Sequence, residues 1–231
     1  MDYKITKDFI MHNRPRTQLR AHGIIIHNTD NLGDSAIANK NYFDTESAKA
    51  SAHFIIDADT IIQCIPTNET AWHAGPTANS LYIGVELCTT NDSKWFNEIW
   101  KRAVYLFAKV FKELDIRSIN SFNLRSHAST SNEYQETDHQ DPLAYFQQFG
   151  VNMELFRKAV QDCINGNDIQ DIIKGEIKKM STDNTPAIPE YKVDGAQYLV
   201  DAGLTTSLHE PLEPVDIGTL GTILRNLQKK Q

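Results

Sequence analysis

Two short runs of continuously apolar sequence constrain the fold of this chain most strongly. Residues 23–29 read Gly-Ile-Ile-Ile-His-Asn-Thr, and residues 82–87 read Tyr-Ile-Gly-Val-Glu-Leu. A strand with one face in water alternates apolar and polar residues, whereas a strand covered on both faces is apolar along its length. Both runs therefore predict strands buried inside a sheet, with His27 at the exit of the first and Glu86 within the second.

Other segments predict a strand pair and two helices. Residues 53–56 and 61–65 indicate two strands that are joined by a tight turn at residues 57–60. Residues 95–114 carry apolar side chains at helical spacing. Residues 152–165 predict a second helix, which Asn152 would cap and Gly166 would end. Strands that alternate with a long helix predict a layered α/β domain.

Composition changes after Gly166, which sets the expected domain organisation. We expect residues 1–166 to form the main domain. Residues 167–188 are polar and weakly periodic, and they predict a linker that begins as a helix around Ile169. Residues 189–231 hold two short amphipathic pieces and predict a small C-terminal helical module. A unit near the roughly 40-residue limit for independent folding is expected to pack on the main domain, dimerise or bind an external surface.

Charge and cysteine content exclude several classes of protein. A net charge of -7 argues against nucleic acid and against an anionic membrane surface as partners. No run approaches the roughly 18 apolar residues that membrane insertion requires, and the N-terminus lacks the apolar core of a secretory signal. Cys64, Cys88 and Cys163 are widely separated, so we expect free thiols in a protein made in a reducing cytoplasm, with zinc ligation as a lesser alternative.

The segment Asp138-His-Gln-Asp-Pro142 places an imidazole and a carboxylate two positions apart. In extended backbone the side chains at i and i+2 point the same way, and Pro142 favours extended backbone at Asp141. We therefore expect His139 and Asp141 to share one face. Surface loops carry such pairs by chance, so the pair indicates a site only in combination with other residues.

Two more histidines stand where a metal site would need them. His27 ends an apolar strand, and His127 follows the short segment Leu124-Arg-Ser. With Asp141 they form a set of two histidines and one carboxylate. Three protein ligands leave the fourth position of a tetrahedral zinc open for water, which is the arrangement of a catalytic site. Each histidine taken alone is better explained by a structural or an exposed position.

Hydrolysis at such a site also needs a proton acceptor beside the water. Glu86 is a carboxylate in an otherwise apolar strand. Burying a charge there is costly unless the charge has a partner or a function. Glu86 is therefore the candidate acceptor, and the alternative is a glutamate at a strand edge that faces solvent.

With these residues in place, the chain resembles the zinc-dependent N-acetylmuramoyl-L-alanine amidases of the type 2 amidase and peptidoglycan-recognition-protein superfamily. The resemblance runs from about residue 23 to residue 166. It rests on four blocks in the family's order, at residues 24–29, 51–57, 71–75 and 83–87. The ending at residues 138–146 is similar to those of phage endolysins and autolysins that act on Gram-positive walls.

The resemblance implies a role for each matching residue. His27 and His127 match the two zinc histidines, and Asp141 matches the third ligand, which precedes the proline of the last motif. Glu86 matches the acidic residue that is proposed as general base. His139 stands where many members have lysine, and a protonated imidazole there would support the oxyanion.

The same blocks supply candidate substrate-binding residues: Asn28, His53, Trp72 and His73. Hydrogen bonding within the core is an equal alternative for His53, and a core position is the alternative for Trp72. The chain departs from some relatives at Ala52, where they have a catalytic tyrosine, and this departure puts more weight on Glu86. Residues 128–137 are polar, and their pattern predicts no structure.

The resemblance implies a central mixed β-sheet flanked by helices and a peptidoglycan hydrolase with Zn²⁺ as its cofactor. Such an enzyme cuts the amide between N-acetylmuramic acid and L-alanine. The absent secretory signal fits a phage or prophage endolysin that is made in the cytoplasm and reaches the cell wall on release. Three alternatives stay open: a non-catalytic peptidoglycan-binding protein, a zinc peptidase that cuts another stem-peptide bond, and an intracellular regulator. The module at residues 189–231 would bind cell wall or form a homodimer.

Overall fold

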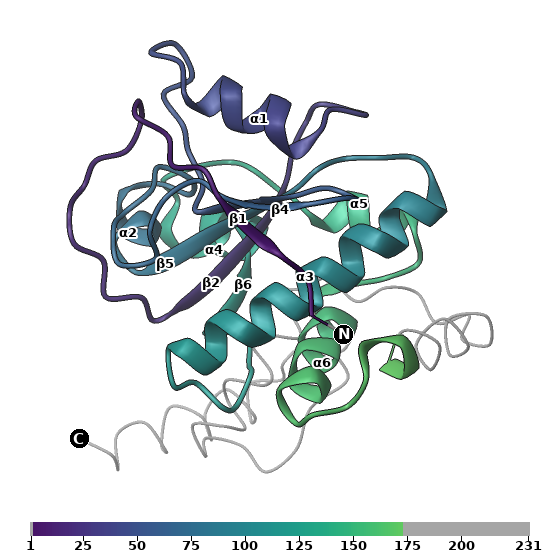
Figure 1. The fold of residues 1–231 in the computed structure, drawn as a ribbon. Coiled ribbons are helices and arrows are strands. Elements are labelled where there is room, and N and C mark those ends of the chain that lie inside the picture. Colours follow the sequence, from purple (N-terminus) through teal and green to yellow (C-terminus); the bar gives the residue numbers. More distant parts are fainter. Residues whose placement is uncertain (1, 173–231) are drawn as a thin grey trace, which may run out of the picture. The chain divides into compact units, whose positions relative to one another are not determined.

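The computed structural model describes residues 2–172, and Figure 1 shows how their helices and strands are arranged. The predicted linker lies outside the described residues beyond residue 172, as does the whole predicted module at residues 189–231. The helix that the sequence predicts around Ile169 begins at that residue and is described as far as residue 172.

Six strands and six helices lie entirely within the described residues. The strands are β1 (Ile5–Lys7), β2 (Gly23–Asn28), β3 (Phe54–Ile56), β4 (Ile61–Gln63), β5 (Tyr82–Leu87) and β6 (Leu124–Ser126). The helices are α1 (Ala36–Phe43), α2 (Pro76–Asn79), α3 (Ser93–Glu113), α4 (His127–Tyr134), α5 (Leu143–Gln148) and α6 (Met153–Ile164). The predicted strands, the long helix and the helix capped by Asn152 are all confirmed.

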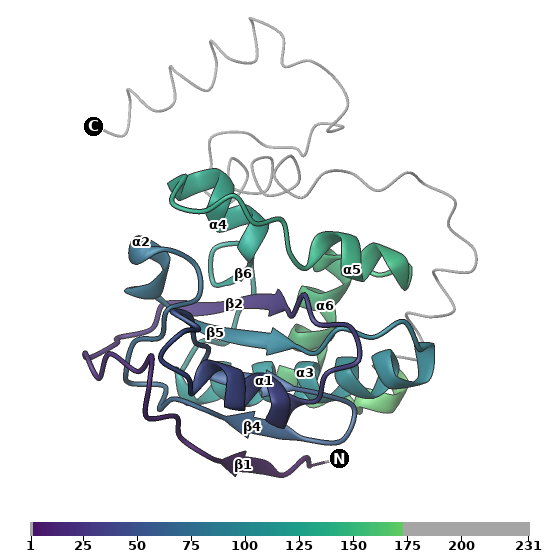
Figure 2. The same ribbon diagram turned by 90° about the horizontal axis from the view of Figure 1, so that it is seen from above.

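The strands form one mixed sheet with the order β1-β4-β3-β5-β2-β6. β3, β5, β2 and β6 run parallel, and β4 pairs antiparallel with β3. In Figure 2 the arrowheads of β2 and β5 point one way, and those of β1 and β4 point the other way. The predicted α/β architecture with a central mixed sheet is therefore confirmed.

The two faces of the central strands carry different kinds of side chain. Ile24 and Ile26 of β2 and Val85 of β5 belong to the large apolar cluster that α3 and α6 share. Because successive side chains on a strand point to opposite faces, His27 and Glu86 lie on the other face. Figure 1 shows α3 and α6 beneath the sheet and α1 above it. The helices α3 and α6 thus cover one face of these strands, and the candidate site residues lie on the opposite face.

Gly23 is required by a close approach between β2 and β6. A Cβ atom at this position would lie 2.0 Å from the carbonyl oxygen of Asn123, which also accepts the backbone hydrogen bond of Ile24. Backbone atoms cannot move aside as a flexible side chain can. We expect Gly23→Ala to lower the free energy of unfolding by about 1–3 kcal/mol, the usual cost of overpacking. Urea unfolding measures this change, and an unchanged midpoint would contradict the assignment.

Candidate metal centre

Three functional side chains come from the carboxyl ends of neighbouring parallel strands. His27 and Glu86 are register partners on β2 and β5. On the other side of β2, Ile26 pairs with Ser126 of β6, and His127 is the next residue along the chain. Carboxyl ends of adjacent parallel strands meet at one edge of a sheet, where α/β proteins commonly bind ligands. The sheet therefore brings together residues that are 100 positions apart.

The chain after β6 folds into a helix that the sequence did not predict. Ser126 caps α4, because its hydroxyl accepts the backbone N–H of Ser129. His127 is the first residue of α4, and the helix ends where Gln135 adopts a left-handed conformation with φ 55°. The strand and the helix cap together fix the direction in which the His127 ring leaves the backbone.

Asp141 reaches the same place from the segment that follows α4. Its backbone carbonyl accepts a hydrogen bond from the N–H of Ala128 at 3.1 Å. Its two carboxylate oxygens lie 3.0 Å from Nδ1 of His27 and 3.0 Å from Nδ1 of His127, and the two Nδ1 atoms are 3.1 Å apart. The predicted set of two histidines and one carboxylate is thus brought together.

This triangle of donor atoms fits a small divalent metal ion. Zinc bound tetrahedrally at about 2.0–2.1 Å requires ligand atoms roughly 3.3 Å from one another, which is close to the spacing found here. His27 is almost fully buried, with 2% of its surface exposed. Two imidazole nitrogens and a carboxylate oxygen are ligands that suit zinc among the common metals.

The charge states of the three groups also favour a cation. Burial would raise the pKa of Asp141, but the imidazoles of His127 and His27, which lie 3.0 Å from its oxygens, hold that pKa well below its usual range. Burial, with His127 nearby, lowers the pKa of His27. At neutral pH the site therefore offers an ionised carboxylate and an unprotonated imidazole, which are the forms that bind metals.

Glu86 lies beside this cluster in an unusual environment. Its Oε2 atom is buried and has no hydrogen-bond partner among the described residues. Burial raises its pKa well above the ordinary value, and the charges of Asp141 and Asp30 add to that effect. The alternative of a solvent-facing strand edge is therefore wrong, because β5 lies between β3 and β2 in the sheet. A buried carboxylate without a partner in a cleft is a candidate for proton transfer.

The second ring nitrogen of each histidine in the cluster also has a partner. Nε2 of His27 lies 3.0 Å from Nδ1 of His73, whose own Nε2 lies 3.1 Å from the carbonyl oxygen of Tyr82. Nε2 of His127 lies 3.1 Å from Oγ1 of Thr137. Sequence reasoning missed Thr137, because it lies in an irregular segment where no periodic pattern marks a buried side chain.

His139 lies at the rim of the cluster. Its ring stacks on that of His127 with centroids 4.7 Å apart and an angle of 7° between the planes. Nδ1 of His139 lies 3.8 Å from Oδ1 of Asp141, and 58% of its side chain is exposed. The two residues therefore share one face, as the His-x-Asp spacing predicts. Among the described residues the group with ligand spacing contains only His27, His127 and Asp141.

A cavity of about 500 Å³ opens over the cluster. Two exposed aromatic residues, Tyr42 and Trp72, form part of its wall. The exposed fraction is 50% for Tyr42 and 44% for Trp72. Lys49 contributes a cation to the wall, and Asp30 contributes a further carboxylate. The sequence drew attention to Trp72 but not to Tyr42, Lys49 or Asp30, because only the fold brings these segments around one opening.

Three of the four predicted substrate-binding residues line this cavity, and the fourth lies in the core. Trp72, His73 and Asn28 line the cavity, although the Asn28 side-chain amide is already bonded to Thr89. His53 is fully buried: its Nε2 bonds the carbonyl of Glu69 and its Nδ1 accepts the N–H of Gly84. Burial lowers the pKa of His53 to about 4. This position corrects the expectation that His53 contacts substrate, because its ring holds two loops and β5 together from inside the core.

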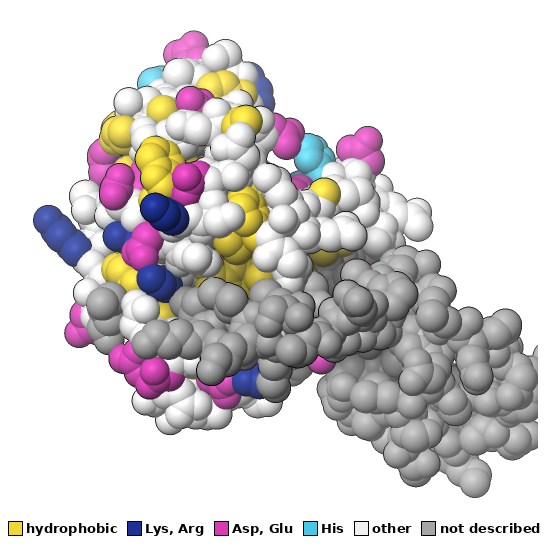
Figure 3. Space-filling model, turned by 90° about the vertical axis from the view of Figure 1, so that its right-hand side faces the viewer, with side chains coloured by type: hydrophobic (Ala, Val, Ile, Leu, Met, Phe, Trp, Pro, Cys, Tyr) yellow, Lys and Arg dark blue, Asp and Glu magenta, His cyan; other side chains and the backbone are white. Residues whose placement is uncertain are grey.

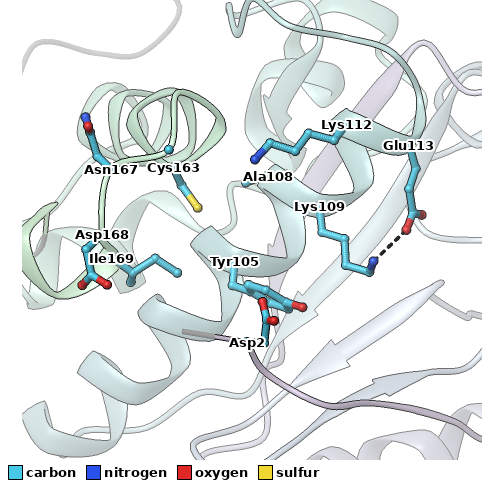
Figure 4. A pocket seen from close by; sticks show the side chains of 11 residues that line it. Asp2, Tyr105, Ala108, Lys109, Lys112, Glu113, Cys163, Asn167, Asp168 and Ile169 are labelled. Atoms are coloured by element: carbon cyan, nitrogen blue, oxygen red, sulfur yellow. Dashed lines mark ion pairs between the residues drawn. The ribbon is translucent and has the colours of Figure 1, made fainter.

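A second cavity lies between α3 and the segment that follows α6 (Figure 4), beneath the sheet in the view of Figure 1. It measures about 550 Å³ and is lined by Tyr105, Lys112 and Cys163 among others. Lys109 on its wall is paired with Glu113. Burial raises the pKa of the Cys163 thiol, so this cysteine is a poor nucleophile. The cavity holds no group of metal-ligand spacing among the described residues.

Figure 3 shows acidic and basic side chains interspersed on one face, without a continuous basic surface in its described part. The three cysteines are free thiols, as expected. Within residues 2–172, no helix is both long and apolar enough to cross a membrane.

Several known proteins are similar to this chain in sequence. Protein Ami of Listeria monocytogenes is 32% identical over 148 residues, which cover 61% of this chain and 16% of that protein. N-acetylmuramoyl-L-alanine amidase CwlA of Bacillus subtilis is 34% identical over 122 residues, covering 50% of this chain and 43% of CwlA. This chain therefore spans less than half the length of these two relatives.

Solved structures of other proteins are also similar to this chain. The catalytic domain of XlyA superposes with a TM-score of 0.57 at 27% identity, covering 68% of this chain and 99% of that domain. Staphylococcus aureus hydrolase AmiA superposes with a TM-score of 0.67, covering 71% of this chain and 85% of AmiA, and at 21% identity it supports the fold alone.

The family described as N-acetylmuramoyl-L-alanine amidase matches residues 17–144, which is more than half of this chain. The matched region begins before β2 and ends after Asp141, so it includes Glu86 and every residue of the candidate metal-binding triangle. The chain belongs to the N-acetylmuramoyl-L-alanine amidase family.

Proposed function

We propose that this protein is a zinc-dependent peptidoglycan amidase that hydrolyses the amide between N-acetylmuramic acid and L-alanine. The observation that carries the proposal is the buried triangle of His27, His127 and Asp141 beside the unpartnered carboxylate of Glu86. Amide hydrolysis needs polarisation of the carbonyl, an activated water and a proton carrier. The relatives named as N-acetylmuramoyl-L-alanine amidases support the choice of bond.

The roles of the side chains follow from their positions. His27, His127 and Asp141 would hold zinc, which when bound polarises the scissile carbonyl and lowers the pKa of water. Glu86 would take the proton from the attacking water and deliver it to the leaving amine of L-alanine. His139, exposed at the rim, would donate a hydrogen bond to the oxygen on which negative charge develops.

The cavity is the proposed site for the sugar and the start of the stem peptide. Its open side and its aromatic walls suit a long substrate of which only one segment enters. We extend the proposal to an endolysin of phage or prophage origin that acts on Gram-positive cell walls from outside the membrane. Peptidoglycan is then the partner, and the protein would meet it only after release from the cell that made it.

Trp72→Ala is expected to weaken substrate binding without stopping the chemistry. A half-exposed indole on the cavity wall offers a flat apolar surface to a sugar or peptide, and such residues often contribute about 1–2 kcal/mol or more to binding. The expected result is a KM for soluble wall fragments that rises roughly 5–30-fold, with kcat changed little. A large fall in kcat at constant KM would contradict this role.

The decisive test is digestion of purified cell wall followed by mass spectrometry of the products. The proposal expects intact stem peptides with a free N-terminal L-alanine, and no products after zinc is removed with a chelator. New reducing sugar ends would identify a glycosidase, and cuts inside the stem peptide would identify a peptidase. Tight binding of wall without any cleavage by the zinc-loaded protein would identify a non-catalytic receptor. Each of these three results would overturn the proposal.

A further inference from the structure

The two histidines of the cluster use the same ring nitrogen. Both direct Nδ1 toward Asp141 and toward each other. A neutral imidazole carries one N–H, so a ring that binds a metal through Nδ1 must carry its proton on Nε2. Which nitrogen is protonated depends on the partner of the other nitrogen. The groups that face the two Nε2 atoms therefore decide whether the cluster can bind a metal.

For His27 that group is His73, and its hydrogen bonds have one consistent direction. Nε2 of His73 lies 3.1 Å from the backbone carbonyl of Tyr82, which can only accept. A neutral His73 therefore has its N–H on Nε2 and a lone pair on Nδ1. That lone pair lies 3.0 Å from Nε2 of His27, so His27 donates to it. The chain of hydrogen bonds leaves Nδ1 of His27 free to bind a metal.

The His73 ring is held in this orientation by its surroundings. A Cβ atom at position 84 would lie 2.5 Å from Cγ of His73, so the ring packs directly onto the backbone at Gly84. The amide oxygen of Asn79 accepts the backbone N–H groups of both His73 and Ala74 at 2.8 Å. His73 is therefore fixed both by its backbone and by its ring, as a supporting residue needs to be.

For His127 the facing group is the hydroxyl of Thr137. Its Oγ1 lies 3.1 Å from Nε2 of His127 and 2.6 Å from Oγ of Ser131. A hydroxyl that donates its single hydrogen to Ser131 keeps lone pairs with which it can accept from His127. With Thr137 as the donor to Ser131, the proton of His127 lies on Nε2 and its Nδ1 is unprotonated. The two ligands thus have separate acceptors, one from each side of the cluster.

We propose that His73 and Thr137 are positioning residues that set the tautomers of His27 and His127, so that both Nδ1 lone pairs face a bound metal. This inference rests on the proposed zinc site. It assigns His73 a structural task toward the metal in place of a hydrogen bond to substrate, because both of its ring nitrogens are engaged within the protein.

The first test compares zinc dissociation constants, measured by competition with a chromophoric chelator. His73→Phe and Thr137→Val keep the approximate shape of each side chain but remove the acceptor. Each is expected to weaken zinc binding about 10–100-fold, the usual effect of losing an outer partner of a metal ligand. Thr137→Ser keeps the hydroxyl and is expected to restore most of the affinity. Wild-type affinity in both acceptor-free variants would overturn the proposal.

His53→Phe is the matched control, because His53 is also a buried histidine next to His73 and Gly84 but does not contact His27. It is expected to lower stability while zinc affinity stays within about threefold of wild type. A loss of affinity equal to that of His73→Phe would overturn the proposal, since general disturbance of the core would then explain both effects.

A second readout does not depend on affinity or on activity. In the zinc-loaded protein labelled with ¹⁵N-histidine, NMR distinguishes the two neutral tautomers of each ring. His73 is expected to carry its proton on Nε2, and a proton on Nδ1 would overturn the proposal. A wild-type protein that binds zinc with this tautomer but cuts no cell wall would refute the proposed function alone, so the two failures are distinguishable.

Discussion

Glu86→Gln is expected to lower the rate of amide cleavage by about 10²–10⁴-fold, the usual contribution of a general base, while zinc remains bound. Glutamine has nearly the same shape as glutamate but cannot accept a proton from water. The three residues that would hold the metal are unchanged in this variant. Loss of activity with full metal content therefore separates proton transfer from metal binding.

The same substitution is expected to leave the metal-free protein as stable as the wild type or more stable. Burial raises the pKa of Glu86 well above its ordinary value, so ionising this group costs the folded protein free energy. As pH rises above the pKa that this carboxyl group has in the unfolded chain, the folded protein loses stability. Glutamine does not ionise and therefore removes this loss. Thermal unfolding at neutral pH measures the change. A variant with lower stability and proportionally lower metal content would indicate a structural role instead.

The measurement combines hydrolysis of purified wall with zinc analysis of the same preparation. Glu98→Gln provides a control of identical chemistry, because Glu98 lies on α3, on the other side of the sheet, where it pairs with Lys101 and Arg102. That control is expected to keep nearly full activity. Near-wild-type turnover by Glu86→Gln would refute the assignment of Glu86 as the proton acceptor.

Asp141→Asn is expected to lose zinc and activity together. The carboxylate supplies the only negative charge in the triangle, and each of its oxygens faces one imidazole at 3.0 Å. An amide has no charge and presents only one oxygen. We expect zinc affinity to fall by more than the roughly 10–100-fold loss that is typical of an outer partner, so that purified protein contains no stoichiometric metal.

Asp141 also influences how stability depends on pH in the metal-free protein. Burial would raise its pKa, but the neighbouring imidazoles of His127 and His27 hold that pKa well below the ordinary range. A carboxyl group whose pKa is lower in the folded than in the unfolded protein stabilises the fold at pH above its unfolded-state pKa. This stabilisation is lost as pH falls toward the folded-state pKa. The variant should therefore lose less stability than wild type on acidification.

Asp138→Asn is the matched control, since Asp138 lies three positions earlier in the same segment and is exposed. This variant should retain both zinc and activity. Metal analysis and wall hydrolysis together decide the outcome. An Asp141→Asn protein that binds zinc as tightly as wild type would show that the carboxylate is not a ligand.

Local sequence patterns were sufficient for the elements of this fold. The continuous apolar runs predicted β2 and β5, helical spacing predicted α3, and Asn152 with Gly166 marked the two ends of α6. These predictions succeed because alternation and helical periodicity report which faces of a segment are buried. Short polar segments such as α4 carry no such signal, and α4 was accordingly missed.

Ordered motifs in the sequence also pointed to four candidate site residues, His27, Glu86, His127 and Asp141, and the structure brings them together around one cavity. It could not decide between the two roles left open for His53, because a histidine next to a strand has the same local pattern whether it points into the core or into a cleft. In the structure, hydrogen bonds to Glu69 and Gly84, which lie on two other segments, hold the His53 ring in the core.

By itself, then, the sequence determined the buried strands, the long helices and the residue types available for catalysis, since these depend on short-range periodicity and composition. The tertiary structure alone decided which of those residues meet. Strand order and register place His27 beside Glu86 on one side and beside the end of β6 on the other. The irregular segment after α4 then brings Thr137 and Asp141 to the same two rings. The physical reason is that a ligand triangle with edges near 3 Å depends on packing between distant segments, which no local pattern records.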